Sequence, residues 1–342
     1  MERNKTRTWQ SFLMIALLAC AVLVFLLNIA MGSVSIPLKE VVSSLFGLDG
    51  VDDVNMAIIM NIRLPRTLAT VVGGASLAVA GVLLQVFFSN PIVEPYVLGI
   101  SSGSSLFVGL VILGGFRFGM KRLSPMGMVL GAFLGAMLVM LTVIFAARKV
   151  KSITTLLIIG LMAGFVCSAI TSMLSAFADK EKIAGFYMWT MGSFAGITWT
   201  QVKLLYFIGV PFLLAAFLMS KPLNSMMIGE KYAQSMGVGI RRFRILIVLI
   251  SSILTALVTA FAGPISFVGL AVPHIVRMVF KTSNNRIILP AVCICGALMT
   301  SLCDLGTRMI MNPVELPLSC MTSIIGAPLV VFLLLKQKGN EL

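Results

Sequence analysis

Apolar runs of about 20 residues recur from one end of the 342-residue chain to the other. A helix of that length crosses the ~30 Å hydrocarbon core of a bilayer. Only 11% of the residues are charged, whereas a soluble domain carries about 25%, so the charges are too few to coat a globule in water. Strands of a membrane barrel would be shorter and would alternate polar with apolar residues, and that alternation is absent. The pattern predicts an all-α integral membrane protein.

We expect about ten transmembrane helices in a single domain that occupies residues 1–342. The first apolar run follows Arg3, Lys5 and Arg7, and it is too long for the core of a signal peptide, so we interpret it as a span that stays. The eighth run is short, and we expect Pro273 to interrupt it. The predicted spans are 9–31, 66–88, 94–115, 125–147, 153–178, 202–220, 244–262, 266–281, 286–307 and 320–336.

The net charge of +14 arises from 26 Lys and Arg residues against 12 Asp and Glu residues. The basic residues lie mostly in short loops between the runs, so membrane topology explains them better than a nucleic-acid partner. An even number of spans puts both termini on one side. The larger share of Lys and Arg is cytoplasmic if that side is the cytoplasm, and we expect this orientation.

The usual signatures of catalysis are missing from the sequence. It contains no G-x-x-x-x-G-K-[ST] phosphate loop and no H-E-x-x-H motif, and its single histidine is His274. The six cysteines include no CxxC pair, so we interpret them as small apolar residues and expect no metal site. Asp304 is the only plausible deep acid, whereas a proton- or sodium-coupled carrier usually keeps several ionisable groups at mid-membrane. We therefore expect the energy for any transport to come from another protein.

The second apolar run and its continuation carry a series of distinctive motifs. The run opens with Arg63-Leu64-Pro65-Arg66 and contains Gly73-Gly74, and small residues of this kind let helices pack closely in lipid. Asn90-Pro91 and Glu94-Pro95 then break the helix before Leu98-Gly99-Ile100-Ser101-Ser102-Gly103. Broken helices of this kind line pathways in transporters.

Further motifs follow in the second half of the chain. Together with those above, they closely resemble the FecCD-type permease family, and the resemblance covers about residues 60–335. The matching segments are Gly229-Glu230-Lys231, Ser235-Met236-Gly237-Val238, Gly263-Pro264-Ile265-Ser266-Phe267-Val268-Gly269-Leu270, Pro273-His274 with Arg277, Asp304-Leu305 with Arg308, Glu315-Leu316-Pro317 and Gly326-Ala327-Pro328.

Members of this family are transmembrane subunits of type II ATP-binding-cassette importers, so the resemblance implies that fold and a function in import. We expect the chain to form the pathway for an iron complex, a ferric siderophore first, with haem or cobalamin as the alternative cargo. A secondary transporter that needs no ATPase is the alternative from another class. The Pro273-His274 pair belongs to the family motif whatever the cargo, so we interpret His274 as structural rather than as a ligand.

The resemblance also implies partners. They are a second permease subunit, identical or different, two ATPase subunits that carry the ATP and Mg, and an extracytoplasmic substrate-binding protein. The chain itself would be no enzyme, would bind no cofactor, and would lie in the cytoplasmic membrane of a bacterium among lipid, with no nucleic acid.

Three arginines match those with which the family docks its binding protein, namely Arg63, Arg66 and Arg308. In the family they pair with glutamates of that protein. A guanidinium suits this task because it offers a fixed fork to a carboxylate and stays charged. The alternative is that the three residues are interfacial anchors in the headgroup layer.

Residues 225–240 match the cytoplasmic segment that fits a groove on the ATPase in this family. From Glu230 to Met236 the chain can form a short helix with the acid at its positive end and Gly237 placed to terminate it. A solvated loop is the alternative. The coupling residues that the resemblance implies are Gly229, Glu230, Ser235, Met236, Gly237 and Val238.

The resemblance places one inner constriction at Asn90 and Ile92 and another at Thr154 and Thr155, which open the fifth span. Small hydroxyl and amide groups at a pore mouth can close by contact and part without breaking ion pairs. Ordinary helix capping by Thr and Asn is the alternative, and the residues by themselves leave both open.

Overall fold

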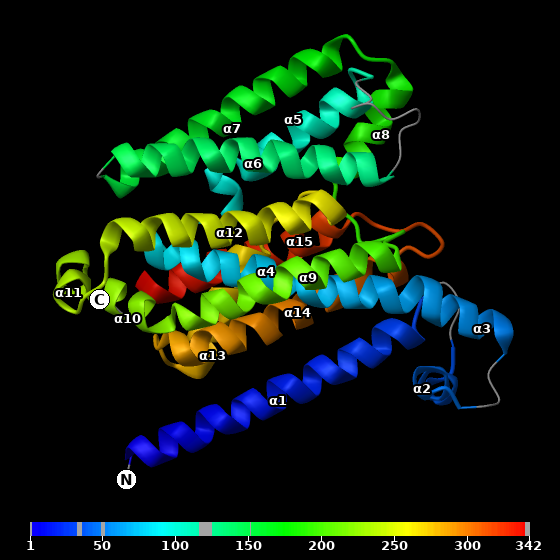
Figure 1. Cartoon of the computed structure of the whole chain (residues 1–342). Helices are drawn as coiled ribbons and strands as arrows, with labels where there is room; N and C mark the ends of the chain where they lie inside the picture. Colours follow the sequence, from blue (N-terminus) through cyan, green and yellow to red (C-terminus); the bar gives the residue numbers. More distant parts are fainter. Residues whose placement is uncertain (1, 33–35, 49–51, 116–124, 151, 339–342) are drawn as a thin grey trace.

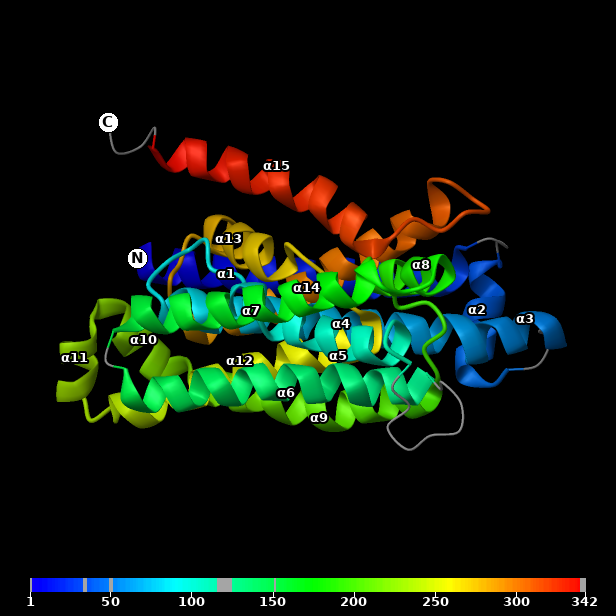
Figure 2. The same ribbon diagram turned by 90° about the horizontal axis from the view of Figure 1, so that it is seen from above.

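The structure is a computed structural model that describes residues 2–32, 36–48, 52–115, 125–150 and 152–338. Helices dominate these residues, and no strand occurs among them. The long helices run side by side in one elongated bundle, with α10 and α11 at one end and α2, α3 and α8 at the other (Figures 1 and 2). The prediction of an all-α membrane protein is confirmed.

In the described part of the chain, seven helical segments are long and apolar enough to cross a membrane. Three shorter apolar helices accompany them, so the predicted total of about ten spans stays a prediction. The helices are α1 (Glu2–Ala30), α2 (Leu38–Phe46), α3 (Asp53–Ile58), α4 (Leu64–Phe87), α5 (Ile100–Ile112), α6 (Pro125–Lys149), α7 (Ile153–Ala176), α8 (Lys180–Thr190), α9 (Trp199–Leu218), α10 (Ser220–Ile228), α11 (Glu230–Ser235), α12 (Ile240–Ala262), α13 (Val268–Phe280), α14 (Asn285–Met309) and α15 (Leu318–Lys338).

Helix α4 is the centre of the bundle. Its residues are buried almost without interruption from Pro65 to Phe87, as expected for a helix that is apolar all round. It packs against α14, α12, α13 and α9. At two of these contacts glycine meets glycine: a Cβ on Gly74 would lie 2.3 Å from the carbonyl oxygen of Gly296, and one on Gly81 would lie 1.9 Å from that of Gly269. The small residues therefore allow the close packing that the sequence predicts.

The second span begins earlier than residue 66. The helix is continuous from α3 through a π-helical turn, η1 (Ile59–Arg63), into α4. Because Pro65 has no N–H, an α-helical bond to the preceding turn is lost at this point. The π turn instead takes the N–H of Leu64 to the carbonyl of Ile59, and this wider turn carries the helix past the proline.

The prediction that Pro273 interrupts the eighth span is wrong, because α13 runs through it. An interior proline leaves the carbonyl four residues earlier without its usual donor. Here that carbonyl belongs to Gly269, and it accepts a hydrogen bond from Nε2 of Gln85 on α4 at 3.2 Å. The same Gln85 side chain accepts from Nη1 of Arg277 at 2.9 Å. A neighbouring helix thus satisfies the group that the proline leaves without a donor.

The predicted helix break is confirmed. Helix α4 ends at Phe87, and a short 3-10 helix, η2 (Pro95–Leu98), follows the intervening loop before α5 begins at Ile100. The turn at Gly99 has a φ of 73°, and a Cβ there would lie 2.6 Å from the carbonyl oxygen of Gly160 on α7. Glycine is therefore required at this turn both for its left-handed backbone and for the close approach of α7.

Candidate docking and coupling sites

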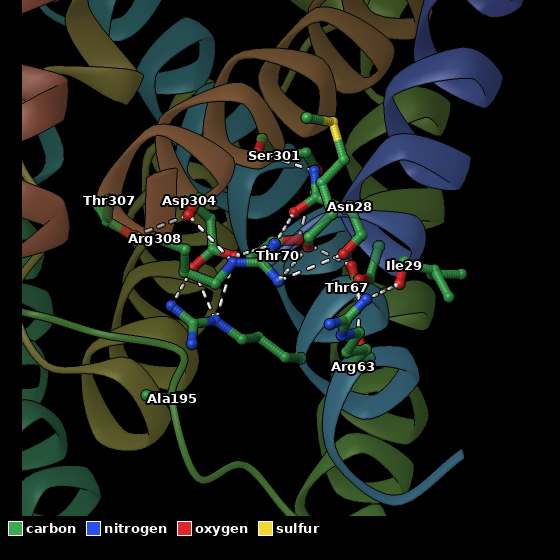
Figure 3. A network of polar contacts seen from close by, with 12 residues as sticks. Asn28, Ile29, Arg63, Thr67, Thr70, Ala195, Ser301, Asp304, Thr307 and Arg308 are labelled. Atoms are coloured by element: carbon green, nitrogen blue, oxygen red, sulfur yellow. Dashed lines mark hydrogen bonds and ion pairs between the residues drawn. The ribbon is translucent and has the colours of Figure 1, made fainter. Parts of the chain in front are cut away.

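Arg63, Arg66 and Arg308 converge at one end of the bundle, which we call the arginine end. Arg63 and Arg66 lie where η1 enters α4, and Arg308 lies in the last turn of α14. Figure 3 shows Asp304 and Arg308 of α14 facing Asn28 of α1, with Arg63 close to Ile29. The tertiary structure therefore brings together three residues that the sequence separates widely.

Asp304 holds two of these arginines. Nε of Arg66 donates to its two carboxylate oxygens at 3.0 and 3.1 Å, and Nη2 of Arg66 lies 3.0 Å from Oδ1. Nη2 of Arg308 lies 3.1 Å from Oδ2 of the same carboxylate. Asp304 is fully buried, so its charge depends on these two guanidinium groups for compensation.

Arg63 and Arg308 also hold the end of α1. Nη1 of Arg63 donates to the carbonyls of Ile29 at 2.8 Å and Ala30 at 2.7 Å. Nη1 of Arg308 donates to the carbonyl of Asn28 at 3.2 Å, and Nη2 donates to the Asn28 side chain. The last carbonyls of a helix have no partners within it and carry partial negative charge. Two cations therefore cap α1 and tie it to α4 and α14, a role that sequence reasoning missed.

All three arginines are buried, with exposed fractions of 4% for Arg63, 6% for Arg66 and 7% for Arg308. Their guanidinium groups face partners inside the chain, whereas the docking prediction expected them to face the binding protein outside it. The spacing of Asp304 and Arg308 by one helical turn is the sequence signal that favours an internal pair. Docking by these residues remains a prediction, and it now requires a guanidinium that a partner can reach.

One contact of the Arg66 guanidinium lies where a partner can reach it. Its Nη1 donates to both carboxylate oxygens of Glu315 at 3.0 Å each, and the Glu315 side chain is 46% exposed. A small cavity of about 180 Å³ opens beside this pair. It is lined by Gly32, Ile58, Ile62, Arg63, Arg66, Arg308 and Glu315.

The opposite end of the bundle, which we call the α11 end, carries the predicted coupling segment. The six-residue helix α11 begins after Gly229, which has a φ of 143°, and ends before Gly237, which has a φ of 84°. The predicted short helix and its terminating glycine are confirmed. Glu230, in the first turn, lies 2.6 Å from Nη2 of Arg244 on α12, which attaches α11 to a long helix of the core.

The tip of this segment faces outward. Met236 is 62% exposed, and Ser235 and Gly237 are exposed beside it, while the N–H of Val238 bonds the carbonyl of Ala233 at 3.0 Å. A groove of about 1280 Å³ lies between this segment, the end of α6 and the start of α12. Its lining includes Arg148, Lys149, Glu230, Gln234, Met236, Gly237, Val238, Arg241, Arg242 and Arg244. An exposed apolar tip beside a basic groove is suited to a protein partner.

The predicted gate residues lie on exposed turns. Oδ1 of Asn90 accepts from the N–H of Ile92 at 3.0 Å, which makes a local turn after α4. Thr154 and Thr155 are exposed in the first turn of α7, and the cap of that helix is the Ser152 hydroxyl, which accepts from the N–H of Thr155 at 3.2 Å. Gating by these residues stays a prediction.

His274 is buried on α13, where Nδ1 lies 3.0 Å from the carbonyl oxygen of Leu270. This contact within its own helix agrees with the structural interpretation of His274. Across the described ranges, no three His, Cys, Asp or Glu side chains lie close enough together to hold a metal ion.

The FecCD transport family model matches residues 13–336. The chain is 36% identical to the vitamin B12 import system permease protein BtuC of Vibrio parahaemolyticus, over 98% of this chain and 96% of that protein. It is 31% identical to the hemin transport system permease protein HmuU of Yersinia pestis, over 93% and 95% of the two chains.

A solved metal-chelate type ABC transporter in an inward-facing conformation has the same fold, with a TM-score of 0.84, 30% identity and coverage of 95% and 99%. These matches extend over both ends of the bundle and the helices between them. The chain therefore belongs to the FecCD transport family and is a multi-span permease of the ATP-binding-cassette importer class.

Proposed function

We propose that this chain forms the translocation pathway for a bulky metal chelate of the cobalamin or haem kind. The observation that carries the proposal is the 36% identity to a vitamin B12 permease along 98% of this chain. The relative named for hemin supports the same class of cargo. The ferric siderophore that we expected first becomes the second candidate, supported by the likeness to a metal-chelate type transporter.

In this proposal the two ends of the bundle bind different partners. The arginine end faces the extracytoplasmic side and receives the substrate-binding protein, and the α11 end faces the cytoplasm and meets the ATPase. Helix α1 begins, and α15 ends, at the α11 end (Figures 1 and 2), which agrees with cytoplasmic termini. The membrane is the cytoplasmic membrane of a bacterium, because the relatives belong to bacteria.

The path for mechanical coupling runs through contacts in this chain. Closure of two ATPase subunits on ATP and Mg moves α11, and the pair between Glu230 and Arg244 carries that motion to α12. Helix α12 packs against α4, which bears Arg66 at its far end. The chain makes and breaks no covalent bond of the cargo, and a second permease subunit completes the pathway.

The test is uptake by the purified permease in proteoliposomes with its ATPase and binding protein. We expect ATP-dependent accumulation of cobalamin or haemin, and less of a ferric siderophore. Accumulation of the siderophore alone would transfer the cargo assignment to the second candidate. Absence of any ATP-dependent uptake would overturn the proposal, and uptake without the ATPase would support a secondary transporter instead.

A further inference from the structure

The arginine end contains one ion pair that differs from the rest. The Arg66 guanidinium divides its donors between two carboxylates: Nε and Nη2 face Asp304, and Nη1 faces Glu315. Water does not reach Asp304, but it reaches nearly half of Glu315. One side of the guanidinium is therefore locked in the protein, and the other side is held by a group at the surface.

The two carboxylates differ in what their departure would cost. Removal of Asp304 would leave the buried guanidinium groups of Arg66 and Arg308 without compensation, which is strongly destabilising. Glu315 is solvated as soon as it turns away, because its side chain is already 46% exposed. Exchange at Nη1 of Arg66 is therefore possible without loss of the buried cluster.

The backbone around Glu315 allows its side chain to leave alone. Glu315 lies outside any helix, in the connection between α14 and α15. The N–H of Leu316 bonds the carbonyl of Thr307 at 3.0 Å, and the N–H of Leu318 bonds the carbonyl of Gly192 at 3.1 Å. Since these bonds hold the chain on the C-terminal side of Glu315, rotation of its side chain uncovers Arg66 without unfolding the connection.

The surroundings fit an incoming acid. The guanidinium groups of Arg66 and Arg308 share the carboxylates of Asp304 and Glu315, and the Arg63 guanidinium lines the same cavity. The adjoining cavity of about 180 Å³ has space for one carboxylate group beside Nη1 of Arg66. Nη1 of Arg66 donates to both oxygens of Glu315, and a charged donor of this kind forms strong hydrogen bonds with any carboxylate that takes that place.

We infer that Glu315 occupies, before docking, the position that a carboxylate of the substrate-binding protein takes on docking. Docking then exchanges one carboxylate for another on Nη1 of Arg66, and Glu315 sets how tightly the binding protein is held and how fast it leaves. The inference rests on the proposed function, because it names the acceptor group on that docking face and the residue that competes for it.

The experiment measures binding of the substrate-binding protein to the permease complex in nanodiscs by biolayer interferometry. The probe is the binding protein that supports ATP-driven uptake in the proteoliposome assay. Glu315→Gln keeps the shape of the side chain and removes its charge, and we expect about tenfold tighter binding, mostly through slower dissociation. Glu181→Gln removes a charge from an exposed side chain on α8 at the same end of the bundle, and we expect no change there.

Two further variants make the result specific. In an Arg66→Gln background the Glu315→Gln change should have no further effect, because the group for which the carboxylates compete is gone. Glu315→Asp keeps the charge but shortens the reach, so we expect an intermediate gain in affinity. If Glu315→Gln fails to fold, Glu315→Asp provides the binding test in its place.

The outcomes distinguish failure of this inference from failure of the proposed function. Equal or weaker binding by both Glu315 variants, with wild-type binding and uptake intact, would overturn this inference and leave the proposed function standing. If no binding protein binds and no ATP-dependent uptake occurs, the proposed function fails, and this inference fails with it.

Discussion

The two ends of the bundle carry their charges in opposite ways. At the arginine end the guanidinium groups are buried and bonded to Asp304, to Glu315 and to the last carbonyls of α1. At the α11 end the charged side chains surround an open groove, and the tip of the segment is an exposed methionine. The difference teaches that the charges at the arginine end bond helices to one another, whereas those at the α11 end line an open groove.

The largest effect should come from the buried acid. Asp304→Ala leaves Arg66 and Arg308 with an unpaired charge in the protein interior, and we expect a loss of about 3–5 kcal/mol in the free energy of unfolding. Thermal unfolding of the detergent-solubilised permease measures it, with Asp52→Ala, an exposed acid near the same end, as the control. An unchanged melting temperature would show that the arginine end is not held by this carboxylate.

A smaller loss should follow when the cap of α1 is removed. Arg63→Met deletes the hydrogen bonds to the carbonyls of Ile29 and Ala30, and we expect a cost of about 1–3 kcal/mol. Because α1 has few other buried contacts, the effect should be local. Hydrogen exchange should rise in the last turn of α1 before it rises in α4. Equal protection of α1 in variant and wild type would refute the capping role.

The ion pair at the α11 end should matter less for stability. Glu230→Gln breaks the contact with Arg244, which is partly exposed, so the expected change is below about 1 kcal/mol. A double-mutant cycle with Arg244→Gln isolates the coupling between the two residues. A coupling energy of about 3–5 kcal/mol, as large as the loss expected for Asp304→Ala, would remove the contrast between the two ends.

The smallest effect on stability should come from the exposed tip. Met236→Ala touches no buried contact, and we expect the free energy of unfolding to stay within about 0.5 kcal/mol of the wild type. ATP-driven uptake in proteoliposomes should nevertheless fall by about tenfold, because the apolar tip would meet the ATPase. Retained uptake would show that this residue lies outside the coupling contact.

Local elements of the fold could be predicted from local sequence. The short helix α11 follows from Glu230 in its first turn and from Gly237, whose left-handed backbone ends it. The break between α4 and α5 follows from the two X-Pro pairs, Asn90-Pro91 and Glu94-Pro95. Both depend on backbone geometry within a few residues, so neighbours in the sequence are sufficient to predict them.

The error at Pro273 shows where such local rules end. The proline removes one donor as expected, but the carbonyl that it leaves is satisfied by Gln85, which lies 184 residues from Gly269 in the sequence. No pattern around residue 273 contains this partner. The helix survives because another helix supplies the hydrogen bond.

The sequence by itself determined that this chain lies in a membrane, that the chain breaks between α4 and α5, and which family it belongs to, because hydropathy, paired prolines and motif order are local or linear properties. Only the tertiary structure decided what its few charges do. Arg66 and Glu315 are 249 residues apart, and their contact depends on how α4 and the connection before α15 meet. Burial and pairing are properties of the packed bundle, so the arginines that the sequence predicted as outward forks hold the bundle together, and the Glu315 side of Arg66 remains open to exchange.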